Sequence, residues 1–330
     1  MSPLTEILRD EIRRDGPISF HRFMETALYD PVHGYYRRAR DPFGKDGDFY
    51  TAEQIQPVFG ILMAARIRPL CQAMGAPPDF TVVELGAGRC EMAAAFSEWR
   101  YIPVDLGLDL RQGAMPEHFR GVVFANEFFD ALPMEEVTFR EGAFHEVRVA
   151  WDERFVWAAG QPVREEVADY LRRYFPPPAD GALFEVNLDA LAWLGRIARA
   201  LDAGFVFTID YGFTRAESVR FPRGSLMSYR RHQADEDVLC DPGAKDITAH
   251  VPFTALEEHG ARLGLETVRF ETLAQTLLAA GEADQFAAAL AASTRDEELR
   301  RRLQLKSLLF GLGETFRTLL QRAGGAHAVK

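Results

Sequence analysis

The stretch Thr81-Val82-Val83-Glu84-Leu85-Gly86-Ala87-Gly88-Arg89-Cys90 decides the fold of this 330-residue chain. Three β-favouring residues lead into an acid, a Gly-x-Gly turn follows, and the alanine-rich run 92–99 comes next. This order predicts a buried strand, a ligand-binding loop and a helix. Glycine suits such a loop because a backbone without Cβ can take positive φ and approach a ligand closely. The amides at the start of the next helix then face that ligand.

The composition of the chain excludes several classes of protein. With 47% hydrophobic and 26% charged residues it is typical of a globular protein, and no apolar run approaches the roughly 20 residues that span a bilayer. A net charge of −11 argues against a nucleic-acid-binding surface. The three cysteines are far apart, form no metal-ligand spacing and suit a reducing compartment. Because the mixed charges of the N-terminus fit neither a signal nor a transit peptide, we expect a cytoplasmic, bacterial-type protein without membrane insertion.

Strand-like and helix-like patterns alternate along the chain, which predicts an α/β fold. Apolar runs predict further strands at 101–105, 122–126, 205–213 and 265–270. Helical spacing predicts helices at 4–14, 18–29, 55–70, 163–175, 188–201 and 253–263, with two or three more in 273–320. Alternation around two turns predicts inserted hairpins within 136–159.

These patterns divide the chain into three parts. We expect an N-terminal helical extension at 1–78, a core at 79–270 and a C-terminal helical segment at 271–330. The core begins after Pro77-Pro78, a pair that marks a break between elements. Insertions into the core are expected at about 134–180 and about 214–250, where hairpin and loop patterns interrupt the alternation of strands and helices.

Polar residues follow the predicted strands, where open α/β sheets bind ligands. Asp105 ends the second strand about 20 residues after the first, a spacing at which βαβ folds place a carboxylate on ribose hydroxyls. Helix capping is the competing role for Asp105. Asn126, Glu127 and Asp130 follow the next strand among aromatic residues, a combination that is unusual for a plain surface loop.

Six motifs occur in order and carry a resemblance to a known family. They are Gly-Asp-Phe-Tyr-Thr at 47–51, Glu-Leu-Gly-Ala-Gly-Arg at 84–89, Asn-Glu-Phe-Phe-Asp-Ala-Leu-Pro at 126–133, Ile-Asp-Tyr-Gly-Phe at 209–213, Gly-Ser-Leu-Met-Ser-Tyr-Arg-Arg-His at 224–232 and Asp-Ile-Thr-Ala-His-Val-Pro-Phe at 246–253. From about His21 to Gly281 the chain resembles the MidA family of S-adenosylmethionine-dependent methyltransferases. The mitochondrial members methylate an arginine on a subunit of respiratory complex I during assembly. The resemblance implies a Rossmann-like methyltransferase core, S-adenosylmethionine as cofactor and a protein substrate.

The resemblance also implies which residues hold the cofactor. Gly86 and Gly88 would let the backbone approach its methionine part, and Glu84 would organise this loop or hold the amino group through a bridging donor. Asp105 would accept from the ribose hydroxyls. Asp48 and Thr51, in the first motif, complete the expected cofactor-binding set, although helix capping alone would explain Thr51.

On the substrate side the resemblance implies Asn126, Glu127 and Asp130. An arginine guanidinium is a cation with delocalised lone pairs, and carboxylates can bind its fork and compensate its charge. Glu127 and Asp130 are therefore the expected catalytic pair, while turn capping is an equal alternative for Asp130. His250 and His232 are expected to be structural, although His250 could accept a proton.

Two departures from the family pattern keep other functions open. Cys90 stands where the family has a third glycine, and the segment 106–120 is short for the distance between core strands. A small-molecule methyltransferase and a non-catalytic assembly factor of the same fold are the alternatives to a protein-arginine methyltransferase. A nicotinamide-dependent oxidoreductase is disfavoured because its glycine motif needs a third glycine at position 91, which is Glu91.

Overall fold

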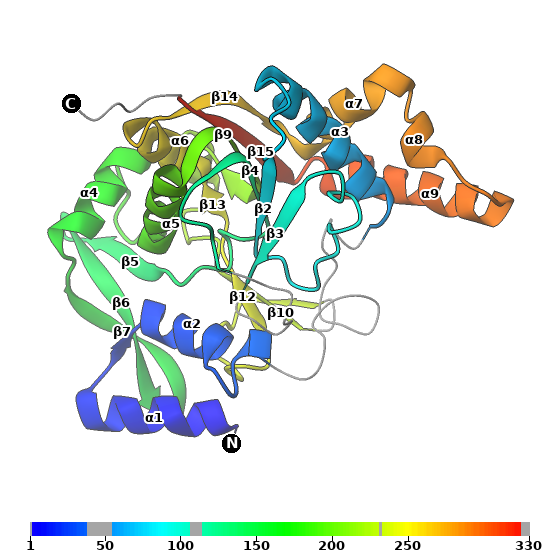
Figure 1. The fold of residues 1–330 in the computed structure, drawn as a ribbon. Helices are drawn as coiled ribbons and strands as arrows, with labels where there is room; N and C mark the ends of the chain where they lie inside the picture. Colours follow the sequence, from blue (N-terminus) through cyan, green and yellow to red (C-terminus); the bar gives the residue numbers. More distant parts are fainter. Residues whose placement is uncertain (1, 38–54, 106–113, 231–232, 325–330) are drawn as a thin grey trace. The chain divides into compact units, whose positions relative to one another are not determined.

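The computed structural model describes residues 2–37, 55–105, 114–230 and 233–324 (Figure 1). The chain divides into two compact units, each assembled from three separate segments. Unit 1 comprises Met1–Tyr50, Phe129–Ala192 and Phe213–Ala255. Unit 2 comprises Thr51–Phe128, Trp193–Gly212 and Leu256–Lys330. We describe the two units separately.

Unit 2 is built on a sheet in the order β14-β15-β9-β4-β2-β3 (Figure 1). Its strands are β2 (Thr81–Leu85), β3 (Arg100–Val104), β4 (Phe119–Asn126), β9 (Leu201–Phe213), β14 (Leu265–Thr272) and β15 (Phe316–Ala323). Strands β3, β2, β4 and β9 run parallel, whereas β15 is antiparallel to both of its neighbours. All five residues of β2 are buried, as expected for a parallel strand covered on both faces. The carboxyl ends of the four parallel strands therefore meet at one edge of the sheet.

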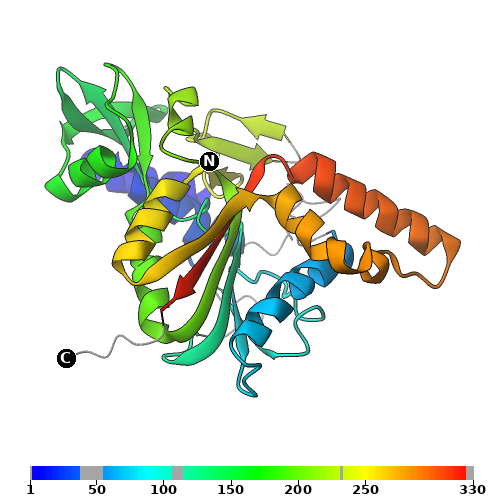
Figure 2. The ribbon, with the colours of Figure 1, turned by 90° about the horizontal axis from the view of Figure 1, so that it is seen from above.

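Helical segments of unit 2 gather around α3 (Figure 2). They are α3 (Val58–Ala73), α7 (Leu273–Gly281), η4 (Glu282–Asp284), α8 (Ala287–Leu290), α9 (Arg295–Ser307) and η5 (Leu308–Leu312). α3 packs against α7, α8 and α9. Between these helices and the sheet, the ring of Phe124 lies edge-on to Phe96 at 5.3 Å and to Phe207 at 6.0 Å. Aromatic side chains thus fill the core that fixes the parallel strands.

Three predictions for unit 2 are wrong in detail. Residues 92–99 form a run of turns rather than a continuous helix, although the Phe96 amide donates to the Met92 carbonyl at 3.0 Å as in a single helical turn. The end of the predicted helical tail is the strand β15, because pairing on both sides by β9 and β14 decides its conformation. The helix predicted at 55–70 begins at Val58 with Pro57 in the capping position, and Thr51, the cap suggested by the sequence, lies outside the described residues.

The predicted strand at 101–105 is confirmed as β3, and its proline has a simple explanation. β3 is the edge strand of the sheet. Proline is tolerated there because its missing N–H group breaks no hydrogen bond between two central strands. Pro103 lies opposite Glu84 in the pairing with β2. The predicted strands at 122–126, 205–213 and 265–270 are confirmed as parts of β4, β9 and β14.

Unit 1 is built on a second, antiparallel sheet in the order β1-β6-β5-β8, with β7 paired to β6. Its strands are β1 (Ile18–Ser19), β5 (Glu135–Arg140), β6 (Ala143–Asp152), β7 (Arg154–Pro162) and β8 (Leu183–Val186). The hairpins predicted within 136–159 are therefore confirmed. A small three-stranded sheet contains β10 (Met227–Arg230), β11 (Gln233–Asp235) and β12 (Asp246–Thr248). Further short elements of unit 1 are η1 (Tyr35–Arg37), η3 (Glu217–Arg220) and β13 (Val251–Pro252).

Helices cover the larger sheet of unit 1. They are α1 (Pro3–Asp15), α2 (Phe20–Tyr29) and α4 (Glu165–Tyr174). Ser19 caps α2 as predicted, since its hydroxyl accepts from the Arg22 amide at 3.1 Å. α2 contributes to an apolar core with β6, and α4 to a second core with β5 and β8. α5 (Leu188–Ala200) and α6 (Phe253–Arg262), both predicted, each contain residues of both units.

Candidate functional site

The glycine loop of unit 2 folds over the end of β3. The Gly86 amide donates to the carbonyl of Val104 at 2.9 Å, and the Gly88 amide donates to Oδ2 of Asp105 at 2.6 Å. Gly86 and Gly88 have φ angles of 71° and 45°, the left-handed conformation that glycine adopts without steric cost. The loop following β2 and the acid following β3 are therefore one hydrogen-bonded structure.

A ring packs directly over the first glycine. A Cβ atom placed on Gly86 would lie 3.2 Å from Cδ2 of Phe128, closer than about nine in ten real Cβ contacts. Phe128 in turn meets the ring of Trp193 edge-on, with centroids 5.1 Å apart. Both its positive φ and this ring therefore favour glycine at position 86, where the backbone is available for close contact with a ligand.

The acid at the end of β2 lies inside the unit. Glu84 is fully buried, and the Tyr101 hydroxyl on the neighbouring strand β3 donates a hydrogen bond to its Oε2. A buried carboxylate needs such donors because burial removes its hydration. Sequence reasoning missed Tyr101, whose role depends on the pairing of β2 with β3.

Cys90 keeps the backbone conformation that a glycine would favour. Its φ angle is 58°, its amide donates to the Ala87 carbonyl at 2.6 Å and its side chain is buried. The thiol is small enough to fit inside the unit, so the loop closes without the third glycine. The short segment after Asp105 is different, because residues 106–113 lie outside the described part of the chain.

The carboxyl end of β4 carries two of the predicted substrate residues. Asn126 is buried, and its Nδ2 donates to Oε1 of Glu127 at 3.1 Å. Glu127 has a φ angle of 50°, and its amide donates to the carbonyl of Ile209 on β9 at 2.9 Å. The Glu127 side chain is partly exposed. Its carboxylate accepts from the Asn126 side chain, and its backbone is hydrogen-bonded to β9. This carboxylate therefore faces solvent at the carboxyl edge of the sheet, where α/β folds bind ligands.

Asp130, the third predicted substrate residue, belongs to unit 1 and is 5% exposed. Its carbonyl accepts from the Ala249 amide at 3.2 Å. The hydroxyl of Tyr36 donates to Oδ1 of Asp246 at 2.8 Å. The pKa of Tyr36 is raised well above its usual value by burial first, and then by charges that include Asp246 and Asp130. Burial and the same two acids raise the pKa of Tyr229.

Tyr36, Tyr229 and Asp246 thus lie around Asp130 in unit 1, and sequence reasoning assigned them no role. Tyr229 and Asp246 lie opposite each other where β10 pairs with β12. Tyr229 lies in the family motif at 224–232 and Asp246 in the one at 246–253, and this membership was the signal that could have identified them. Motif membership cannot reveal which residues of two separate segments pair with each other.

The remaining candidates divide into described and undescribed residues. Burial lowers the pKa of His250, whose ring meets Phe221 edge-on at 4.9 Å, and these features support its structural reading. Asp210 is fully buried on β9 and accepts from the Tyr211 amide at 2.9 Å. Asp48, Thr51 and His232 lie outside the described residues. Within the described part of the chain, no group of three or more His, Cys, Asp or Glu side chains is arranged to hold a metal ion.

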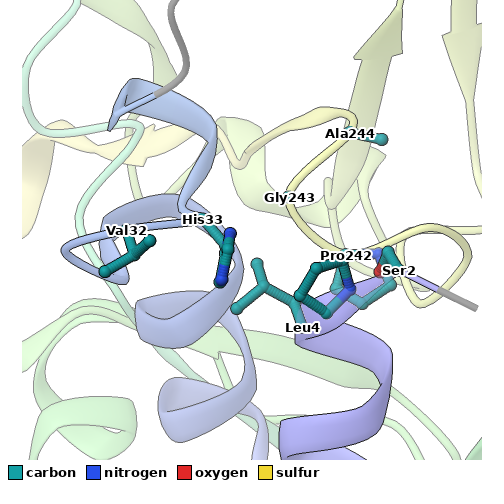
Figure 3. A pocket seen from close by; sticks show the side chains of 8 residues that line it. Ser2, Leu4, Val32, His33, Pro242, Gly243 and Ala244 are labelled. Atoms are coloured by element: carbon teal, nitrogen blue, oxygen red, sulfur yellow. The ribbon is translucent and has the colours of Figure 1, made fainter.

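A pocket of about 270 Å³ in unit 1 lies apart from these candidates (Figure 3). Its lining residues are Ser2, Pro3, Leu4, Val32, His33, Pro242, Gly243 and Ala244. None of the predicted site residues lines it. Among the described residues, every helix is too short or too polar to cross a bilayer.

The residues of unit 2 fit the cofactor that the sequence implies. Two glycines with positive φ leave loop backbone open to a ligand, and a partly exposed acid follows the adjacent strand. A carboxylate has about four acceptor positions, so Asp105 can bind the Gly88 amide and still accept from a ribose hydroxyl. The buried Glu84, which accepts from the Tyr101 hydroxyl, lies next to the last residue of β2, from which this loop departs.

Comparisons with known proteins agree with this geometry. A family model described as "Putative S-adenosyl-L-methionine-dependent methyltransferase" matches residues 108–271. The chain is 27% identical over 308 residues to a Drosophila melanogaster protein named "Protein arginine methyltransferase NDUFAF7 homolog, mitochondrial", covering 76% of this chain and 68% of that one. It is also 27% identical over 323 residues to the human protein arginine methyltransferase NDUFAF7, covering 77% and 69% of the two chains.

Two solved structures from Burkholderia thailandensis are also similar. One, bound to S-adenosyl-homocysteine, has a TM-score of 0.85 and 29% identity, with 98% of this chain and 92% of that chain covered. The other, described as a COG1565 superfamily protein, has a TM-score of 0.81 and 32% identity, with coverages of 98% and 91%. The similarity therefore extends over both units rather than over the glycine loop alone.

Proposed function

Because the chain belongs to the MidA family of S-adenosylmethionine-dependent methyltransferases, we propose that it methylates an arginine side chain of a protein partner. S-adenosylmethionine is its methyl donor. The names of the fly and human relatives support arginine as acceptor and protein as substrate class. We further propose a respiratory-complex subunit as the partner, by resemblance to the mitochondrial members, and a reducing cytoplasm as the location, which three free cysteines suit.

The cofactor is assigned to the carboxyl edge of the unit 2 sheet. We assign the backbone at Gly86 and Gly88 to its methionine part and Asp105 to its ribose hydroxyls. Glu84 is assigned a supporting role, because its carboxylate is fully buried and bonded to Tyr101. Asp48 and Thr51 remain proposed ligands from the first motif.

The single observation that carries the acceptor assignment is the partly exposed carboxylate of Glu127, held by Asn126 at the end of β4. A guanidinium is planar and cationic, so a carboxylate can bind it through two parallel N–H···O bonds. This contact fixes which nitrogen faces the donor and compensates the positive charge. We assign Asp130 as a second acceptor-side carboxylate.

Methyl transfer is an in-line displacement in which positioning supplies much of the catalysis. When bound, S-adenosylmethionine supplies a methyl group activated by its positive sulfur. The backbone at Gly86 and Gly88 and the Asp105 carboxylate would hold this donor, whose carbon–sulfur bond would break as the acceptor nitrogen takes the methyl group. The acceptor nitrogen then releases one proton, and the Glu127 carboxylate is placed to hold it before it passes to water.

The test uses S-adenosylmethionine with a radioactive methyl group and protein extract from cells that lack this enzyme. We expect label in the protein fraction, recovered as methylarginine after hydrolysis, and none with the Glu127→Gln variant. Label recovered only in small molecules would replace this proposal by the small-molecule alternative. Saturable cofactor binding without labelled product would favour a non-catalytic assembly factor.

A further inference from the structure

Two glutamates lie opposite each other in the larger sheet of unit 1. Glu136 on β5 is the pairing partner of Glu185 on β8, so both side chains point to the same face. They are only 4% and 6% exposed. Like charges directly opposite on neighbouring strands repel, and burial strengthens the repulsion. This arrangement is stable only if one of the two carboxyls keeps its proton.

Hydrogen bonds favour the ionised form at Glu185. Its Oε1 accepts from the amides of Ser225 at 2.6 Å and Leu226 at 3.2 Å, and its Oε2 accepts from the Ser225 hydroxyl at 3.2 Å. The chain approaches so closely that a Cβ on Gly224 would lie 2.2 Å from Oε1, at a φ of +76°. The start of the motif at 224–232 is therefore shaped around one buried carboxylate.

The bonds continue from Glu185 to a proposed acceptor residue. The Ser225 hydroxyl oxygen accepts from the His250 amide at 2.9 Å. The neighbouring Ala249 amide donates to the carbonyl of Asp130 at 3.2 Å. Glu185 thus joins the segments at 224–226 and 249–250 to the backbone of Asp130 within unit 1.

Glu136 has the opposite environment. Its Oε2 is buried and hydrogen-bonds to no residue that the structure describes. Burial first, and then the charge of Glu185, raise the pKa of Glu136 well above the usual value for a glutamate. Burial also raises the pKa of Glu185, but the bonds from Ser225 and Leu226 act against this. The proton of the pair therefore resides on Glu136.

Other titratable groups near the pair have different partners or positions. On α2, His21 pairs with Asp189 and Arg22 with Glu11 and Glu25. On β6, His145 lies on the Glu136 face of the sheet, whereas Glu146 and Arg148 face the other way and pair with each other. On α4, burial raises the pKa of Tyr170 further above its already high value. On β5 itself, Glu135 points to the opposite face and pairs with Arg164.

We propose that Glu185 is a positioning residue for Asp130, and that the proton on Glu136 controls it. With Glu136 neutral, Glu185 holds the 224–226 turn and, through it, the segment bonded to Asp130. When Glu136 loses its proton, two buried negative charges face each other and the turn is released. Raising the pH through the Glu136 transition therefore loosens the acceptor side. The effect of this pH change on methyl transfer rests on the proposed function, whereas the release of the 224–226 turn does not.

The test is hydrogen exchange at the Ser225 and Leu226 amides, which donate to Glu185, corrected for intrinsic exchange rates. In the wild type we expect protection to fall at least about tenfold as the pH is raised over the range in which the protein stays folded. Glu136→Gln, which is neutral at every pH, should keep its protection across this range. Glu185→Gln should lower protection at every pH. Glu135→Gln, the matched control on the opposite face, should behave as the wild type.

Two outcomes would overturn the proposal. One is constant protection of these amides in the wild type, and the other is equal pH sensitivity in the wild type and Glu136→Gln. A second measurement follows methyl transfer against pH, where the wild type should lose activity as the pH rises and Glu136→Gln should lose less. Absence of transfer at every pH with the expected exchange behaviour would refute the proposed function and leave the carboxyl pair supported.

Discussion

The amide of Gly88 donates a 2.6 Å hydrogen bond to Oδ2 of Asp105, which joins the glycine loop to the acid that follows the next strand. Sequence spacing assigned this acid to a ribose or to a helix cap. The observed bond adds a third role, because the same carboxylate holds the loop that must approach the cofactor. Cofactor affinity should therefore depend on Asp105 both through direct contact and through the position of the loop.

Replacing Asp105 tests this double dependence. We expect Asp105→Ala to raise the Kd for S-adenosylmethionine roughly 10- to 100-fold, the effect of losing a hydrogen bond to a charged group. Calorimetric titration, with NADH as control ligand, measures this directly. Asp79→Ala removes an exposed acid that precedes β2, at the opposite end of that strand from the glycine loop, and should leave affinity unchanged. Wild-type affinity in Asp105→Ala would exclude the ribose assignment.

Glu127 is predicted to act on the acceptor rather than on the cofactor. Glu127→Gln keeps the shape of the side chain but removes the charge that a guanidinium needs, so transfer should fall by at least about 100-fold. The Kd for S-adenosylmethionine should stay within a few fold. The matched control is Glu141→Gln, an exposed glutamate that also has positive φ. An equal loss of cofactor binding would remove Glu127 from the acceptor role.

The Tyr101 hydroxyl is predicted to stabilise unit 2 through Glu84. Tyr101→Phe removes a donor from a fully buried carboxylate, which should lower the free energy of unfolding by about 1–3 kcal/mol. Urea denaturation measures this loss. Tyr229→Phe removes a hydroxyl from a half-buried tyrosine of unit 1 and should change stability by less than about 0.5 kcal/mol. Equal effects of the two changes would mean that the Glu84 contact contributes nothing.

The His21–Asp189 pair gives stability a pH dependence. Nε2 of His21 lies 3.1 Å from Oδ2 of Asp189, and this bond raises the pKa of the histidine against the opposing effect of burial. A raised pKa means that the contribution is complete below the unfolded value of about 6.5 and is lost as the pH rises through the folded value. Because both side chains are about one-third exposed or more, we expect a loss of less than about 1 kcal/mol.

Asp189→Asn should remove this pH-dependent part of the unfolding free energy, measured by urea denaturation at about pH 6 and about pH 8. Asp202→Asn is the control, since it breaks the similar but exposed contact of His118 with Asp202 at 3.0 Å. The prediction is wrong if both variants change the pH dependence equally.

Sequence reasoning succeeded where structure follows from a local pattern. The apolar run into Glu84, the glycine turn and the runs at 122–126 and 205–213 predicted strands that the structure contains, because buried parallel strands consist of continuous apolar residues. The MidA family and its cofactor followed from ordered motifs. Which residues bind the acceptor remains a prediction.

Sequence reasoning failed where residues distant in the sequence decide the local structure. Residues 316–323 are ambiguous between helix and strand until β9 and β14 pair with them. Tyr101 and Glu84 become partners only through the register of two strands. Nothing near Glu136 in the sequence indicates Glu185, because their contact depends on the pairing of β5 with β8. Such relationships depend on tertiary structure and cannot be read from spacing.

The insertion of β15 between β9 and β14 has a consequence for biosynthesis. Phe316 pairs with Tyr211, so this part of the sheet joins residues about a hundred positions apart. The ribosome makes β9 and β14 first, and each then presents an edge of unpaired backbone groups. Until residues 316–323 emerge, the nascent chain carries two open edges at which other strands can add.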